Sequence, residues 1–160
     1  TISGLESEGR YQIDEQIVTV IPTDDGGRLN AMKVIITDED GNPIKDANGK
    51  DISVRFDMSG DELFEYLSEN DGKITFTIPE GFEQNVRIIC EDCAVNESDE
   101  VNVYDEVFEK VTVSQSGWVI FYANKPLFYG SIAGVAGLAV ALFLIIFFKK
   151  KKIKKKNNKV

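Results

Sequence analysis

The sequence predicts a mostly β protein: an antiparallel β-sandwich of about seven short strands, followed by a single C-terminal transmembrane α-helix. Three observations lead to this prediction. Apolar and polar residues alternate with a period of two in several segments, turn residues separate those segments, and one long uncharged apolar segment lies near the C-terminus. Alternation places one face of each segment in a core and the other in water, as sandwich strands require.

The first element is a short β-branched run at residues 17–21, which Pro22 ends. Clear alternation follows at residues 32–37, 52–57, 73–78 and 86–91, and a final short strand is expected at 111–113. Turn chemistry separates the later segments at Asn48-Gly49, Asn70-Asp71-Gly72 and Pro79-Glu80-Gly81. We expect a hairpin at Asn70-Asp71-Gly72, because it directly precedes a cleanly alternating segment.

Residues 59–67 fit two local structures. Ser59 and Glu62 have the spacing of a helix capping box, and Leu63, Phe64 and Leu67 would then share one helical face. Alternatively, the segment is a strand that presents Phe64 and Tyr66 on one side. We expect the strand, because it could pair with the hairpin that follows.

The apolar segment at residues 127–148 contains no charged residue. As a helix its 22 residues would measure about 33 Å, which matches a hydrocarbon core of about 30 Å. We therefore predict that it spans a lipid bilayer. The anchor residues that we single out are Leu127, Gly130, Gly134, Gly137, Leu142 and Phe148.

Positive charge gives the expected orientation. Four lysines, Lys149, Lys150, Lys151 and Lys152, directly follow the apolar segment, whereas only Lys125 lies close to its other end. Because lysine-rich flanks stay in the cytoplasm, we expect a single-pass plasma-membrane protein with an extracellular N-terminal domain and a cytoplasmic tail at 149–160. The tail lysines could also bind anionic lipid headgroups.

Small residues repeat along the predicted membrane helix. Gly130 and Gly134 form a GxxxG motif, and small residues also recur every four positions at Ala133, Gly137 and Ala141. Such a face lets two helices approach closely, so weak self-association is one possibility. Small residues are also common in membrane helices that stay monomeric.

The charge distribution excludes several functions. The net charge is −9 and the last twelve residues contribute +8, so residues 1–148 carry −17. A domain this acidic repels nucleic acid, so we expect no nucleic-acid partner. The chain contains no histidine, which excludes catalytic triads and zinc sites built on histidine.

Two polar clusters have spacings that resemble those of cysteine or calcium sites. Cys90 and Cys93 have CxxC spacing, and a local disulfide between them is possible. The favoured interpretation is two cysteines without special chemistry. Asp38, Asp40 and Asn42 resemble calcium ligands, but the EF-hand spacing fails and we expect a solvated turn. Weak cation binding by the acids between residues 91 and 100 stays open. No catalytic residue, cofactor or metal is expected.

The domain boundaries follow from these elements. The β-sandwich is expected at residues 11–114 and a juxtamembrane segment at 115–126. Residues 1–10 are polar and lack a signal-peptide pattern. We therefore expect them to be a linker from an upstream region, or the start of a chain whose signal has been removed.

Three motifs resemble one known family. Residues 34–43 (VIITDEDGNP), 70–82 (NDGKITFTIPEGF), and 88–96 (IICEDCAVN) with 111–114 (VTVS) are similar to the Ig-like domains repeated in Gram-positive bacterial surface proteins. Residues 121–134 (FYANKPLFYGSIAG) resemble the C-terminal anchor that follows such domains. The resemblance implies an Ig-like sandwich and a stalk or adhesion role. No LPxTG sortase motif precedes the apolar segment, so we expect the helix to stay in the membrane.

The expected function is therefore a non-enzymatic, membrane-anchored extracellular module that acts as a stalk or binds a surface protein or glycan. The alternative is the membrane-proximal anchor of a larger cell-surface enzyme whose catalytic domain lies upstream. The sequence before Thr1 would distinguish the two, because further Ig-like repeats favour the first and a catalytic domain favours the second.

Overall fold

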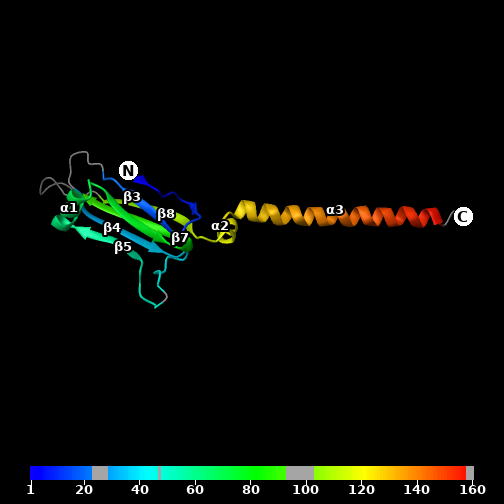
Figure 1. Cartoon of the computed structure of the whole chain (residues 1–160), viewed down its shortest axis with the longest axis horizontal. Helices are drawn as coiled ribbons and strands as arrows, with labels where there is room; N and C mark the ends of the chain where they lie inside the picture. Colours follow the sequence, from blue (N-terminus) through cyan, green and yellow to red (C-terminus); the bar gives the residue numbers. More distant parts are fainter. Residues whose placement is uncertain (23–28, 47, 93–102, 158–160) are drawn as a thin grey trace. The chain divides into compact units, whose positions relative to one another are not determined.

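The computed structural model describes residues 1–22, 29–46, 48–92 and 103–157, and side chains as far as residue 150. The chain forms two compact units, Thr1–Ala123 and Asn124–Val160. In the described part of the chain, the first unit contains every strand together with helices α1 (Gly60–Glu69) and α2 (Gly117–Ala123), and the second contains helix α3 (Lys125–Asn157) (Figure 1). The predicted class, mostly β with a C-terminal apolar helix, is confirmed.

A three-stranded antiparallel sheet has the order β1-β3-β6. It consists of β1 (Ile2–Ser3), β3 (Glu15–Val20) and β6 (Ile74–Pro79). The register pairs Val18 of β3 with Phe76 of β6. On this sheet the alternation of β6 is complete, because Ile74, Phe76 and Ile78 are buried and the residues between them are not.

The second sheet has five strands in the order β2-β8-β7-β4-β5. These are β2 (Arg10–Tyr11), β8 (Val103–Val113), β7 (Gly81–Asp92), β4 (Leu29–Thr37) and β5 (Val54–Ser59). The short β2 runs parallel to β8, and the other neighbours are antiparallel. The alternation predicted for residues 32–37 is also confirmed, since Met32, Val34 and Ile36 are buried.

The two sheets share one hydrophobic core. Its members are Val18, Val20, Ile74, Phe76 and Ile78 from the small sheet and Met32, Val34, Ile36, Phe56, Val86, Ile88, Phe108, Val111 and Val113 from the large one, with Leu63 of α1. The apolar residues of both sheets therefore lie in one cluster, and some polar residues of the large sheet, Gln84 and Thr112 among them, are buried as well. Burial of apolar area from both sheets is the main source of stability for such a unit.

The first ten residues pair with the folded unit. β1 pairs with β3, Glu8 N–H donates to the Glu109 carbonyl at 2.8 Å, and Ile2 and Leu5 pack against the core. The sequence suggested a linker here because the segment is polar and lacks a signal-peptide pattern. Its partners lie far away in the chain, so a local pattern could not reveal the pairing.

The strand expected over residues 59–67 is wrong, because this segment forms α1. Leu63 on α1 is fully buried, Tyr66 and Leu67 pack against the core, and the Tyr66 ring meets Phe56 edge-on at 5.3 Å. Ser59 precedes the helix in an extended conformation but makes no side-chain capping hydrogen bond. The core-facing residues Leu63, Tyr66 and Leu67 have the i, i+3, i+4 spacing of one helical face. Phe64, which the helical alternative placed on that face, is 54% exposed.

The sheet topology explains this correction. β5 belongs to the five-stranded sheet and β6 to the three-stranded sheet, so the chain crosses between sheets at this point and α1 makes the crossing. The hairpin expected at Asn70-Asp71-Gly72 is consequently absent. These residues end the helix instead: Asp71 has a positive φ, and Gly72 N–H donates to the Leu67 carbonyl at 2.8 Å.

Candidate functional site

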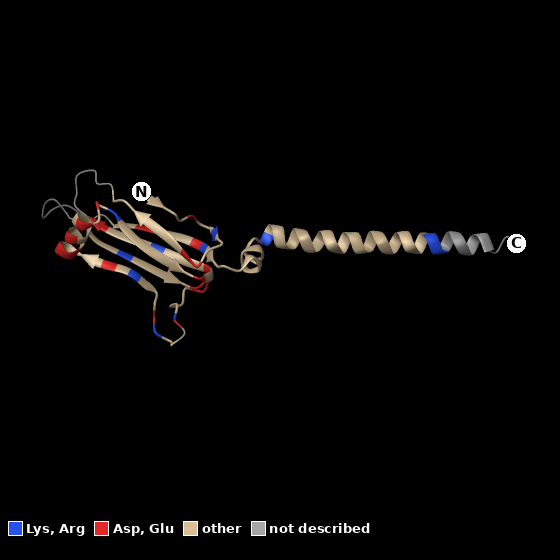
Figure 2. Cartoon of the chain, in the orientation of Figure 1, with Lys and Arg blue, Asp and Glu red and all other residues tan. Residues whose placement is uncertain are grey.

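Helix α3 is the part of the described chain that is long and apolar enough to cross a membrane. All six anchor residues predicted from the sequence lie on it, and all six are exposed. Figure 2 shows no charge on α3 between Lys125 and the lysines that begin at Lys149. Lys151 and Lys152 continue the helix, but their side chains lie outside the described residues.

The start of α3 carries a feature that the sequence reasoning missed. The Asn124 side-chain oxygen accepts a hydrogen bond from Leu127 N–H at 3.3 Å, and the Asn124 carbonyl accepts one from Phe128 N–H at 2.9 Å. Asparagine is a preferred N-cap residue, and proline is tolerated in the first turn, where Pro126 lies. The Asn-Lys-Pro sequence was therefore a readable signal for the helix start.

Gly130, Gly134 and Gly137 lie on one face of α3, because they occupy positions i, i+4 and i+7. A Cβ atom added at any of the three would meet nothing within 4 Å. The described residues of the same chain therefore do not cover this face. Self-association through it stays a prediction.

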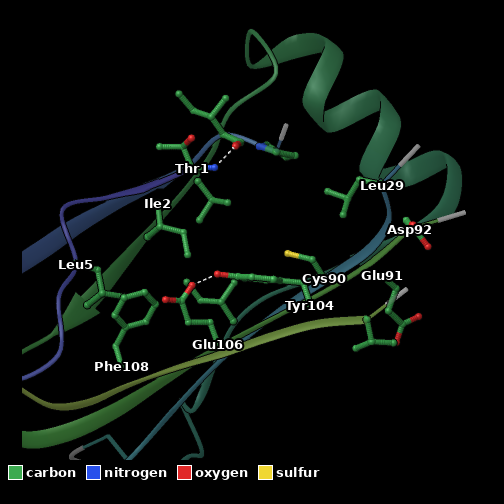
Figure 3. A pocket seen from close by; sticks show the side chains of 15 residues that line it. Thr1, Ile2, Leu5, Leu29, Cys90, Glu91, Asp92, Tyr104, Glu106 and Phe108 are labelled. Carbon is green, nitrogen blue, oxygen red and sulfur yellow. Dashed lines mark hydrogen bonds between the residues drawn. The ribbon is translucent and has the colours of Figure 1, made fainter. Parts of the chain in front are cut away.

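A pocket of about 690 Å³ opens on the first unit. It is lined from both sheets by Thr1, Ile2, Leu5, Val20, Ile21, Pro22, Leu29, Ile88, Cys90, Glu91, Asp92, Val103, Tyr104, Glu106 and Phe108 (Figure 3). The Thr1 ammonium donates to the Ile21 carbonyl at 2.7 Å, and the Tyr104 hydroxyl donates to the Glu106 carboxylate. Local sequence patterns do not predict this pocket, because its walls come from segments far apart in the chain.

Cys90 lines this pocket and is partly buried. Burial raises the pKa of its thiol, and the opposing effect of the nearby N-terminal ammonium is smaller. The thiol is therefore protonated at neutral pH, which makes it a weak nucleophile. Cys93, and with it the possible disulfide, lies outside the described residues.

The suspected calcium ligands form a turn. The Asp38 carboxylate accepts hydrogen bonds from the backbone N–H groups of Asp40 at 3.0 Å and Asn42 at 2.7 Å, and from the Asn42 amide at 3.1 Å. These bonds, the Asn42 side chain first, lower the pKa of Asp38. The hydrogen bonds to Asp38 form the turn that was predicted for this segment.

A second turn repeats this design eight residues later. The Asp46 carboxylate accepts from Asn48 N–H at 2.8 Å and Lys50 N–H at 2.9 Å. In both turns a glycine with positive φ, Gly41 or Gly49, stands three residues after the aspartate. Within the described residues, no three His, Cys, Asp or Glu side chains come together as metal ligands. Residues 93–102, which include most of the acidic run, are outside that search.

An ion pair lies on the exposed face of the five-stranded sheet. Arg87 on β7 donates to both carboxylate oxygens of Asp105 on β8, from Nε at 2.9 Å and from Nη2 at 2.5 Å. This bidentate geometry is the strongest form of an arginine–carboxylate contact. The hydrogen bonds from Arg87 lower the pKa of Asp105.

We expect Asp105→Asn to reduce stability slightly at neutral pH and to have no effect in acid. The folded-state pKa of Asp105 lies below its ordinary value of about 3.9, so the ionised carboxylate stabilises the fold above that value. This contribution is lost as the pH falls through the lowered pKa. Urea unfolding of both proteins from pH 7 downward measures the difference. A difference that grows in acid would contradict the assignment.

No family model, curated protein or solved structure matches this chain. The family resemblance therefore rests on the sequence motifs alone.

Proposed function

We propose that this chain is the membrane-anchored end of a bacterial cell-surface protein, in which an extracellular Ig-like β-sandwich serves as a stalk or adhesion module without enzymatic activity. The observation that carries this proposal is the order of parts along the chain. A folded, acidic β unit ends at Ala123, and a helix long and apolar enough to cross a membrane begins at Lys125.

The proposed sandwich is supported by the shared core. Buried residues of a three-stranded and a five-stranded sheet form one cluster, as the two inner faces of a sandwich do. The motifs at residues 34–43 and 88–96 support the Ig-like assignment. A unit held by many cross-strand hydrogen bonds can bear load between upstream domains and the membrane.

The proposed orientation is supported by charge. The lysines that follow the apolar segment would stay in the cytoplasm and the acidic unit would be outside. A surface protein or glycan is the expected partner of the outer unit. Its solvent-open surfaces, including the pocket near Thr1 and Tyr104, are where such a partner could bind.

Amine labelling of intact cells tests the orientation. The first unit carries Lys33, Lys45, Lys50, Lys73 and Lys110, whereas eight lysines follow Phe148. A membrane-impermeant amine reagent is expected to label the first group on intact cells, and the tail only after the cells are permeabilised. Tail labelling on intact cells would reverse the topology and remove the basis for an extracellular module.

A further inference from the structure

A second apolar surface lies on the first unit at helix α2. It is a shallow hollow lined by Phe82, Trp118, Val119 and Tyr122, which we call the aromatic patch. Trp118 is 80% exposed, Tyr122 45% and Phe82 36%. Exposed aromatic side chains that gather around one hollow are a candidate interaction surface.

The aromatic patch is built into the folded unit. Helix α2 contacts β2, β7 and β8, and Ala123 at its end is buried. The rings of Phe82 and Tyr122 lie 5.5 Å apart. Phe82 lies where the pairing of β7 with β8 is irregular, between Gly81 and Gln84. The next residue, Glu83, is held to β8 by a hydrogen bond of 3.1 Å from its backbone N–H to the Thr112 hydroxyl. The segment 115–126, expected to be a juxtamembrane spacer, therefore contributes a fixed surface.

The length of chain between the patch and the apolar segment limits what can cover it. Helix α2 ends at Ala123, and the apolar segment begins at Leu127. Four residues reach at most about 14 Å even when fully extended. If α3 crosses a bilayer, the end of α2 must therefore lie within about 14 Å of the point where the chain enters the hydrocarbon.

The chemistry of the patch suits the same location. Residues 111–124 contain no charged side chain, in a unit that is otherwise strongly acidic. Tryptophan and tyrosine concentrate where membranes meet water, because their rings are apolar and their N–H and O–H groups bond to headgroups and water. An uncharged aromatic surface so close to the entry point avoids the cost of desolvating carboxylates there.

We propose that the aromatic patch inserts into the headgroup region of the leaflet that α3 enters, and so docks the β unit on the membrane. This inference rests on the proposed membrane anchoring. Docking would hold the unit in a defined orientation by two attachments, the covalent connection through Asn124 and the patch, instead of leaving it to swing on a short tether. Val119 and Phe82 would supply apolar contact, and Trp118 would reach deepest because it is the most exposed.

The single tryptophan of the chain makes the proposal directly measurable. Trp118 is the only tryptophan, so the intrinsic fluorescence of the full-length protein reports on the patch alone. We would reconstitute the protein in phosphatidylcholine vesicles that carry bromine atoms either near the headgroup end of the acyl chains or near their terminus. Iodide present on both sides of the membrane would measure access from water, and flotation of the vesicles would confirm anchoring.

Docking predicts a blue-shifted emission, strong quenching by bromine near the headgroup end, weaker quenching by bromine near the chain terminus, and little quenching by iodide. Protein that floats with the vesicles but shows strong iodide quenching and no bromine quenching would overturn docking and leave anchoring intact. Protein that does not float would overturn both. Trp118 could instead be protected from iodide without being quenched by bromine. If that protection increased with the protein-to-lipid ratio, the patch would be assigned to a contact with a second copy of the chain, and docking on lipid would be overturned.

A matched pair of variants tests whether the patch acts as one surface. Phe82→Asp places a charge beside Trp118, whereas Phe64→Asp places the same charge on exposed α1, which contacts β4 and β5 instead. Phe82→Asp is expected to lower bromine quenching of Trp118 and raise iodide quenching, and Phe64→Asp to change neither. Circular dichroism checks that both variants fold. Equal lipid quenching in the two variants would contradict a joint role for Phe82.

Discussion

Replacing Leu138 with lysine is expected to release much of the protein from the membrane. Leu138 lies near the middle of the apolar segment 127–148 and is exposed on α3. A lysine at the centre of a membrane helix disfavours insertion by about 2.5–3.5 kcal/mol, and the favourable contribution of leucine is lost as well. The insertion equilibrium therefore changes by roughly several hundredfold. Extraction of membranes with alkaline carbonate, followed by immunoblotting of the supernatant, measures the released fraction.

Phe148→Lys is the matched control. It introduces the same side chain at the end of the apolar segment, directly beside Lys149. A lysine there reaches the headgroups and water through its flexible stem, so insertion should hardly change. Full membrane retention of Leu138→Lys would contradict a spanning role for α3. Release of both variants would indicate that the helix spans the membrane only when the apolar segment keeps its full length.

The second large effect is expected from Ile78→Ala, which should cost about 2–5 kcal/mol of unfolding free energy. Ile78 on β6 has 0% exposure and contributes to the core that both sheets share. Truncation removes buried methyl and methylene groups and leaves a cavity that close-packed neighbours fill only in part. The loss would be a large share of the roughly 5–15 kcal/mol typical of a domain. Pulse proteolysis of the full chain in increasing urea measures it.

Ile17→Ala makes the same chemical change on the neighbouring strand β3. Ile17 pairs with Thr77, the residue next to Ile78, but its side chain is 61% exposed. Its truncation should change stability by less than about 0.5 kcal/mol. Similar losses of unfolding free energy for Ile78→Ala and Ile17→Ala would show that the face of the small sheet that carries Ile78 is not the buried one.

Several features were predictable because their signals are local. Alternation identified the strands around Val34, Phe76 and Ile88, since a side chain every second residue faces the core whatever its partner. The absence of charge from residue 127 to 148 identified α3 in the same way. Asp38 and its neighbours were read correctly as a turn, because an aspartate carboxylate bonds to backbone N–H groups a few residues along.

The candidate surfaces were only partly predictable. The aromatic residues before the apolar segment, Trp118 and Tyr122 among them, are visible in the sequence, but the surface that they form is not. Phe82 comes from the start of β7, and only the fold brings its ring to Tyr122. The pocket beside Cys90 likewise joins residue 1 to residues beyond 100, and no local pattern connects them.

The sequence by itself determined the class of the protein, the positions of most strands and the position of the apolar helix, because these depend on periodicity and composition along a short stretch of chain. The tertiary structure decided what depends on partners far away in the chain. It made α1 a crossing between sheets where a strand was expected, because β5 and β6 pair in different sheets. It drew residues 1–10 into pairing with β3 and β8, and it assembled the aromatic patch, because hydrogen-bond partners and buried neighbours are chosen by the whole fold.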